Sequence, residues 1–160
     1  MTCLILAGRV GSSMAAEIGT MAVSEELDAL EVMSIDPVDY LVMPRFIAFS
    51  IMAPVLTLLA ALIGVLAAGF VAELQVGLSF STYWQQVLDV VKIKDVNTGL
   101  AKALVFGIAV SMICCSEGLR TKGGAAGVGR ATRKSVVDSF VAIIVFNYFM
   151  TSIIQRLFYS

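Results

Sequence analysis

Carboxylates are the reactive side chains that this sequence gathers most closely. Seven of its twelve acidic residues lie between Gly8 and Arg45. Clustered carboxylates can transfer protons or hold a metal ion, but no aspartates here have a metal-binding spacing, and the chain has no histidine to act as base or ligand. No serine lies in a nucleophile-elbow context. We therefore predict no catalytic residue and no metal site, and interpret the carboxylates as charge on a solvated surface.

These carboxylates lie in a segment that is predicted to form a short amphipathic helix over residues 24–35. Ser24 is its predicted N-cap, followed by acidic residues that the helix dipole favours in a first turn. Leu27, Leu30 and Met33 recur at near-helical spacing and would form one apolar stripe. Such a helix is too charged to span lipid and too negative to lie on anionic headgroups.

We expect this acidic helix to be a cytoplasmic surface element that binds a protein partner. The alternative is a solvated surface helix whose apolar stripe faces only the membrane domain. In the first case its exposed carboxylates and its leucines would both contact the partner. The residues predicted to carry that contact are Glu25, Glu26, Leu27, Asp28, Leu30 and Glu31.

Three polar side chains lie inside otherwise apolar sequence. A lysine within a membrane span is costly and suggests function, so Lys102 is a candidate substrate-binding residue, although a lysine near the end of a span can also extend its amine to the interface. Asn147 and Thr151 are one helical turn apart and could hydrogen-bond across helices. Asn147 is therefore a second candidate, with helix packing as the alternative role.

The basic segment over residues 117–134, EGLRTKGGAAGVGRATRK, is rich in glycine, as phosphate-binding loops are. Residues 124–131 have the glycine spacing of a Walker A loop, but Arg130 replaces the lysine and Ala131 replaces the hydroxyl residue. The segment also follows an apolar helix where that motif requires a strand. We predict a flexible basic turn between two spans, near anionic headgroups or a cytoplasmic partner.

Composition places the chain in a membrane. Its 160 residues are 59% hydrophobic and 14% charged, with a mean hydropathy of +0.92, whereas soluble domains average about 25% charged residues. A net charge of −1 gives no electrostatic basis for binding nucleic acid. Cys3, Cys114 and Cys115 form no CxxC pair and are predicted to be buried, reduced side chains.

The apolar stretches predict one partial and three complete membrane spans. The partial span covers residues 1–22, so the chain looks truncated or part of a longer subunit. The complete spans are predicted at 46–72, 98–116 and 135–154, each long enough to cross a bilayer. Small residues four apart would let neighbouring helices approach closely, within one chain or between two. The longest such series is Gly99, Ala103, Gly107, Ser111 and Cys115.

Basic residues set the expected orientation. Most of them lie in the 117–134 segment or at Arg45, so the positive-inside rule places that segment and the acidic helix in the cytoplasm. The more polar stretch over residues 73–97 and the C-terminus would then face outward.

Three segments resemble the MlaE/YrbE permease family of ABC transporters. These are Ala7–Arg45 (AGRVGSSMAAEIGTMAVSEELDALEVMSIDPVDYLVMPR), Gly123–Thr132 (GGAAGVGRAT) and Val96–Gly107 (VNTGLAKALVFG). The resemblance covers essentially the whole chain, but only about the C-terminal three-fifths of a typical family member. It implies a homodimeric permease bound to two cytoplasmic ABC ATPase subunits and to a periplasmic MCE-domain lipid-binding protein.

The resemblance also assigns roles to individual residues. It implies that Ser24–Met33 is the coupling helix that docks on the ATPase, and that Lys102 faces the lipid pathway. Asn147 stands where many relatives are expected to carry an aspartate. Family members move phospholipids, or in some cases sterols or other lipids. ATP and Mg would be bound by the partner, so we expect no cofactor in this chain.

We therefore expect an all-α polytopic transmembrane bundle, one permease domain over residues 1–160, with a short cytoplasmic coupling helix at 24–35. The predicted function is the permease subunit of an ABC transporter that moves lipid between membranes from the bacterial inner membrane. Two alternatives are a membrane scaffold that does not transport and an integral-membrane enzyme that modifies lipids. ATP-dependent lipid transfer would distinguish the first, and activity without an ATPase the second.

Overall fold

The computed structural model describes residues 1–77 and 79–158, and every regular element in them is helical. The fold is therefore all-α, as predicted. Long apolar runs form the long helices because a helix satisfies every backbone polar group within its own segment. In chain order the elements are α1 (Thr2–Leu6), η1 (Ala7–Gly11), α2 (Ser12–Val23), α3 (Glu26–Val32), η2 (Val38–Val42), α4 (Met43–Val76), α5 (Phe80–Val90), α6 (Ile93–Leu119) and α7 (Gly124–Phe158).

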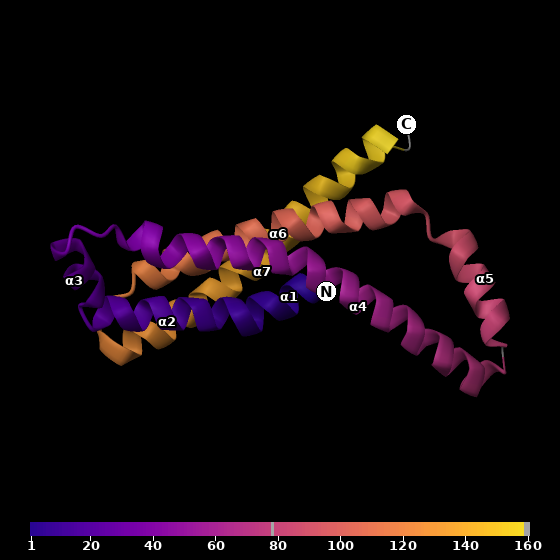
Figure 1. The fold of residues 1–160 in the computed structure, drawn as a ribbon, viewed down its shortest axis with the longest axis horizontal. Coiled ribbons are helices and arrows are strands. Elements are labelled where there is room, and N and C mark those ends of the chain that lie inside the picture. The colour runs from indigo at the N-terminus through magenta and orange to yellow at the C-terminus, as the bar shows by residue number, and fades with distance from the viewer. Residues whose placement is uncertain (78, 159–160) are drawn as a thin grey trace.

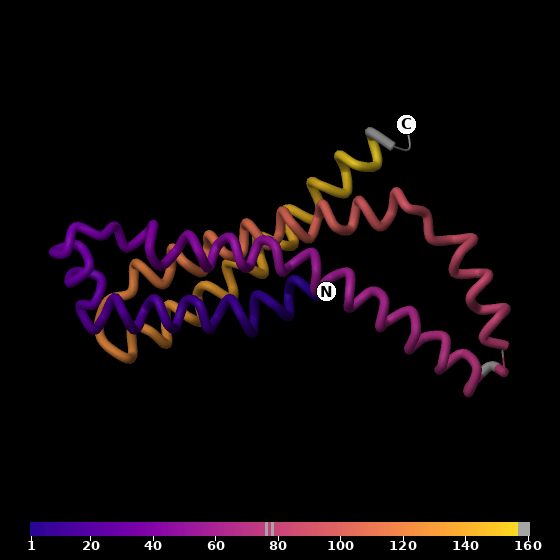
Figure 2. The backbone as a smooth tube through the Cα atoms, in the orientation of Figure 1, coloured from indigo at the N-terminus to yellow at the C-terminus, as the bar shows by residue number. Residues whose placement is uncertain are grey.

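Four helical rods run side by side to form the bundle (Figure 1). The first rod is α1, η1 and α2, which continue into one another through the π-helical turn η1 without a break in the backbone (Figure 2). α6 packs against α4, α7 and α2, and α2 also packs against α7. Beyond the bundle α4 and α6 separate, and α5 joins their far ends.

Small residues form the closest contacts inside the bundle. A Cβ added to Gly107 on α6 would lie 2.9 Å from the Cβ of Ala53 on α4. One added to Gly118 would lie 2.8 Å from the Cβ of Ile18 on α2. Gly118 lies outside the predicted small-residue series on α6, but three members of that series besides Gly107 are buried: Ala103, Ser111 and Cys115. The series is therefore a packing seam within this chain, apart from Gly99, whose added Cβ would have no described atom of another element within 4 Å.

Three helical stretches are long and apolar enough to cross a membrane: Val38–Gln75, Ile93–Leu119 and Gly124–Arg156. They contain the three ranges expected from the sequence and extend beyond each of them. The expected partial span corresponds to the rod from α1 to α2. With this composition, the three stretches make the chain a multi-pass membrane protein.

Two local predictions were wrong. The 117–134 segment is not a flexible turn throughout, because the turn covers only residues 120–123 and α7 begins at Gly124. Gly123 and Gly124, with φ of 90° and 66°, make that turn without a Cβ penalty. Ser24 does not cap the acidic helix: it is the C-terminal cap residue of α2, and its hydroxyl donates to the Thr20 carbonyl at 3.0 Å.

Candidate functional site

The acidic helix α3 projects from one end of the bundle, the end at which the turn between α6 and α7 also lies (Figure 1). It covers Glu26–Val32, shorter than the predicted 24–35, and contains no buried residue. Leu27 and Leu30 are half-buried, whereas Met33 is 68% exposed, so the predicted apolar stripe is covered over only part of its length. An exposed charged face next to partly exposed leucines is a surface suited to a protein partner.

Left-handed backbone marks both ends of α3. Glu25 immediately before the helix and Ser34 just after it each have φ of 61°, which is uncommon for residues with a Cβ. The Ser24 hydroxyl lies 3.0 Å from Glu26 Oε1 and steadies the first of these turns. The chain therefore reverses sharply on either side of α3, and the helix stands apart from the rods that carry it.

The carboxylates of α3 remain available to a partner. Glu25, Glu26, Asp28 and Glu31 are all exposed, and none forms an ion pair with any residue in the part of the chain that the structure describes. The ion pairs found there join other residues. Four unneutralised carboxylates on one short helix give it a strong negative potential, which favours association with a basic surface.

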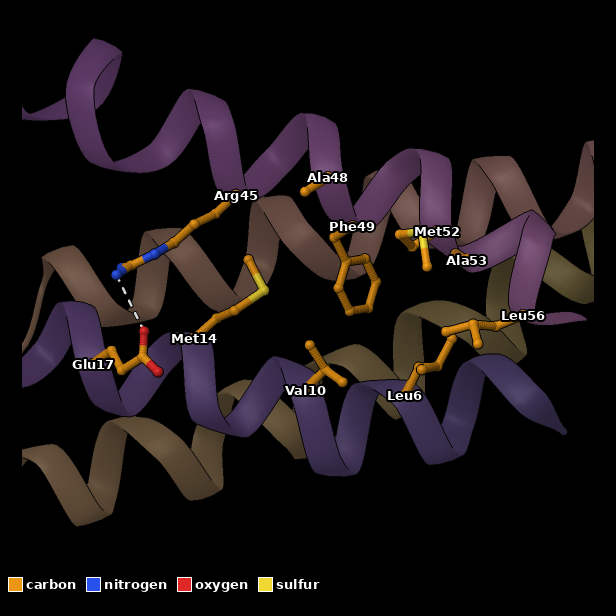
Figure 3. A pocket seen from close by; sticks show the side chains of 10 residues that line it. All are labelled: Leu6, Val10, Met14, Glu17, Arg45, Ala48, Phe49, Met52, Ala53 and Leu56. Carbon is orange, nitrogen blue, oxygen red and sulfur yellow. Dashed lines mark ion pairs between the residues drawn. The ribbon is translucent and has the colours of Figure 1, made fainter.

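The segment after α3 connects it firmly to α4. Pro37 is buried, and Asp36 Oδ1 accepts a hydrogen bond from the Val38 amide at 2.8 Å. At the start of α4, Arg45 Nη2 lies 3.1 Å from Glu17 Oε2 on α2 (Figure 3). The two helices that flank α3 are thus joined to each other near the points where α3 leaves them.

Sequence reasoning missed the pair Glu17 and Arg45 as site residues. A signal was present, because Glu17 is a charged residue within a small-residue helix and Arg45 opens an apolar span. Nothing in the sequence pairs the two, since the segment between them includes a helix and two turns. Their approach depends on how α2 and α4 are rotated about their own axes.

Lys102 on α6 connects this helix to α7. Its amine donates a hydrogen bond to Thr151 Oγ1 on α7 at 2.8 Å, and the Thr151 hydroxyl donates to the Asn147 carbonyl at 2.6 Å. Lys102 is half-buried, and Asn147 is exposed. The structure therefore brings Lys102 to Thr151 rather than to the Asn147 side chain, so Thr151 joins the candidate site.

Cys3, Cys114 and Cys115 are buried free thiols, as predicted. Cys114 Sγ lies 3.6 Å from Ser139 Oγ, which places it in the packing between α6 and α7. Within residues 1–77 and 79–158, no three His, Cys, Asp or Glu side chains gather as metal ligands would. Three features are thus candidates for function. They are the projecting acidic helix α3, the Arg45–Glu17 ion pair that joins its two flanking helices (the anchoring pair), and the Lys102 amine between α6 and α7.

Comparison with known proteins identifies the family of the chain. The family described as Permease MlaE matches residues 1–153. A probable ABC transporter permease of Synechocystis is 43% identical over 94% of this chain, and one of Rickettsia typhi is 44% identical over 96%. The chloroplast protein Trigalactosyldiacylglycerol 1 of Arabidopsis thaliana is 38% identical over 95%.

This chain spans only part of each relative: 57%, 59% and 43% of their lengths, in the same order. The family match nevertheless includes every element up to α6 and most of α7, which extends beyond it to Phe158. The names of the Synechocystis and Rickettsia relatives denote transporter permeases, which is a non-enzymatic role, and the family match covers nearly the whole chain. The protein belongs to the MlaE permease family.

Proposed function

We propose that this chain is the membrane-embedded part of an ABC transporter permease that moves lipid, driven by ATP hydrolysis in a separate cytoplasmic subunit. The observation that carries the proposal is the position of α3, an exposed acidic helix held between two bundle helices at the basic end of the molecule. Family membership supplies the ATPase as the natural partner for that surface.

In this mechanism α3 is the contact through which the ATPase moves the permease. Closure of the ATPase would push on Glu25, Glu26 and Asp28 and on the leucines beside them. The buried Pro37 and the turn η2 would pass the displacement into α4, while the Arg45–Glu17 pair would pass it into α2. Because packed helices shift between discrete arrangements, a small push at one end can open or close a cavity elsewhere.

Lipid is the proposed substrate. The name of the Arabidopsis relative refers to a diacylglycerol lipid, and the exposed side chains are apolar between Ile47 and Val71 on α4 and between Val137 and Phe146 on α7. We assign Lys102, with Thr151, to contact with the polar part of the lipid, and retain Asn147 as a weaker candidate. Phospholipid transfer from the bacterial inner membrane, with an MCE-domain protein outside, is the finer form of this proposal.

A homodimer is part of the same proposal. Ala60, Gly64 and Ala68 form a small-residue stripe on α4 that stays exposed, and nothing in the described residues lies within 4 Å of a Cβ added to Gly64. Small residues on an exposed membrane helix permit close packing by a second helix.

The decisive experiment is reconstitution of the complex in vesicles. The chain is co-expressed with its ATPase, purified, and assayed for transfer of fluorescent phospholipid to acceptor vesicles with ATP or with a non-hydrolysable analogue. Transfer that requires hydrolysis supports the permease. Equal transfer under both conditions, or none, would contradict it and leave the scaffold or enzyme alternative.

A further inference from the structure

A groove of about 400 Å³ runs between the first helical rod and α4 (Figure 3). Leu6, Val10 and Met14 form one wall, and Phe49, Met52 and Leu56 form the other. Among the described residues that line it, the charged side chains are Arg45 and Glu17, which lie together at one end. The groove is therefore apolar along its length and polar at a single end, which is the pattern of a lipid.

The polar end has an unused hydrogen-bond donor. Arg45 Nη2 is paired with Glu17, whereas Arg45 Nη1 is buried and has no hydrogen-bond partner among residues 1–77 and 79–158. Buried guanidinium donors are almost always hydrogen-bonded, because a buried donor without an acceptor costs free energy. Arg45 also lines the groove, and its side chain is 25% exposed. A phosphate there would meet a cation whose hydrogen-bonding capacity Glu17 does not exhaust.

The length and direction of the groove match one leaflet. From Arg45 to Leu56 the helix rises about 16 Å at 1.5 Å per residue, close to half of the roughly 30 Å hydrocarbon core. The Arg45 end lies on the side of α3 and of the turn between α6 and α7. Since the basic residues assign that side to the cytoplasm, a lipid of the cytoplasmic leaflet would place its headgroup at Arg45 and its chain along the apolar walls.

Charge selects the headgroup. Arg45 and Glu17 together are neutral, and the Glu17 side chain is 60% exposed at the mouth of the groove. We propose that this groove binds one acyl chain of a zwitterionic phospholipid from the cytoplasmic leaflet, with its phosphate at the exposed part of the Arg45 side chain and its ammonium beside the Glu17 carboxylate. An anionic headgroup without an ammonium would leave that carboxylate unmatched. The proposal requires the membrane orientation but not ATP-driven transport.

A tryptophan placed in the groove tests this directly. The chain has one tryptophan, so Met52→Trp in a Trp84→Phe background gives a single indole at the wall. The protein is reconstituted in bilayers that contain brominated acyl chains on phosphatidylethanolamine, on phosphatidylglycerol or on diacylglycerol, which has no phosphate. We expect phosphatidylethanolamine to quench best, with a preference over phosphatidylglycerol of about three-fold, the size of a partly exposed ion pair.

Two variants separate the two contacts. Arg45→Gln should lower the preference for phosphatidylethanolamine over diacylglycerol several-fold, and Glu17→Gln should remove its preference over phosphatidylglycerol. Lys134→Gln is the matched control, because it breaks the 2.9 Å ion pair with Glu117 away from the groove and should leave both preferences unchanged. Equal quenching by all three lipids overturns the proposal. Absence of quenching overturns it too, since protein would then cover the groove.

Discussion

The guanidinium of Arg45 lies 3.1 Å from the carboxylate of Glu17. This contact joins α4 to α2, the helices on either side of α3 in the chain. Arg45 is 25% exposed and Glu17 is 60% exposed. A pair so accessible to solvent stabilises the fold by only about 0–1 kcal/mol. We propose that its role is geometric: it holds the start of α4 beside α2, so that a displacement of α3 reaches both helices.

Charge reversal on α3 should abolish binding of the ATPase subunit. The triple variant Glu25→Lys, Glu26→Lys and Asp28→Lys reverses exposed charges that no described residue neutralises. Membrane insertion should be unaffected, because none of these side chains is buried. Co-purification of the ATPase with the tagged chain measures the effect. Asp89→Lys, an equally exposed reversal on α5, is the control, and undiminished co-purification of the triple variant would refute the docking role.

Loss of the anchoring pair should uncouple transport from binding. Glu17→Gln removes the ion pair but leaves the surface of α3 intact, so the ATPase should still co-purify while ATP-dependent lipid transfer falls several-fold. The measurement compares both quantities on one preparation. Lys134→Gln, which breaks the other ion pair of the described residues, should retain full transfer. Normal transfer by Glu17→Gln would show that α2 and α4 need no such link.

A methyl group at Gly107 should destabilise the bundle. Gly107→Ala would place a Cβ 2.9 Å from Ala53 Cβ and 3.5 Å from Ser50 Cα, atoms attached directly to the backbone of α4. Overpacking of this kind costs about 1–3 kcal/mol, of which the better helix propensity of alanine returns up to about 1 kcal/mol. Thermal unfolding in detergent measures the change. Gly129→Ala on α7 would meet no described atom of another element within 4 Å and should be neutral or stabilising. Equal effects of the two substitutions would be inconsistent with the seam.

Removal of the Lys102 amine should reduce lipid binding. Lys102→Ala deletes the donor that reaches Thr151 between α6 and α7, and we expect the purified complex to retain less lipid by mass spectrometry. Thr151→Val removes the hydrogen-bond partner but keeps the charge, so its lipid content should fall less. Wild-type lipid content in Lys102→Ala would leave the lysine with a structural role alone.

Local patterns in the sequence determined the class of the molecule. Mean hydropathy and three long apolar runs predict a helical membrane bundle, because in lipid only a helix satisfies its own backbone over such lengths. The acidic segment is likewise recognisable locally, since its charge is incompatible with the bilayer on either side of it. Its ends were less predictable: Ser24 is a favoured N-cap residue, yet the turn at Glu25 makes it the end of α2 instead.

Only the tertiary structure decided which side chains meet. The four-residue spacing on α6 indicated a seam but not its partner, which at Gly107 is Ala53 on α4. The pairs Arg45–Glu17 and Lys102–Thr151 join separate helices. Helical periodicity fixes which residues share a face, but not the rotation of one rod against another. That rotation is set by close packing of the whole bundle, and it places an unpaired guanidinium nitrogen at the end of an apolar groove.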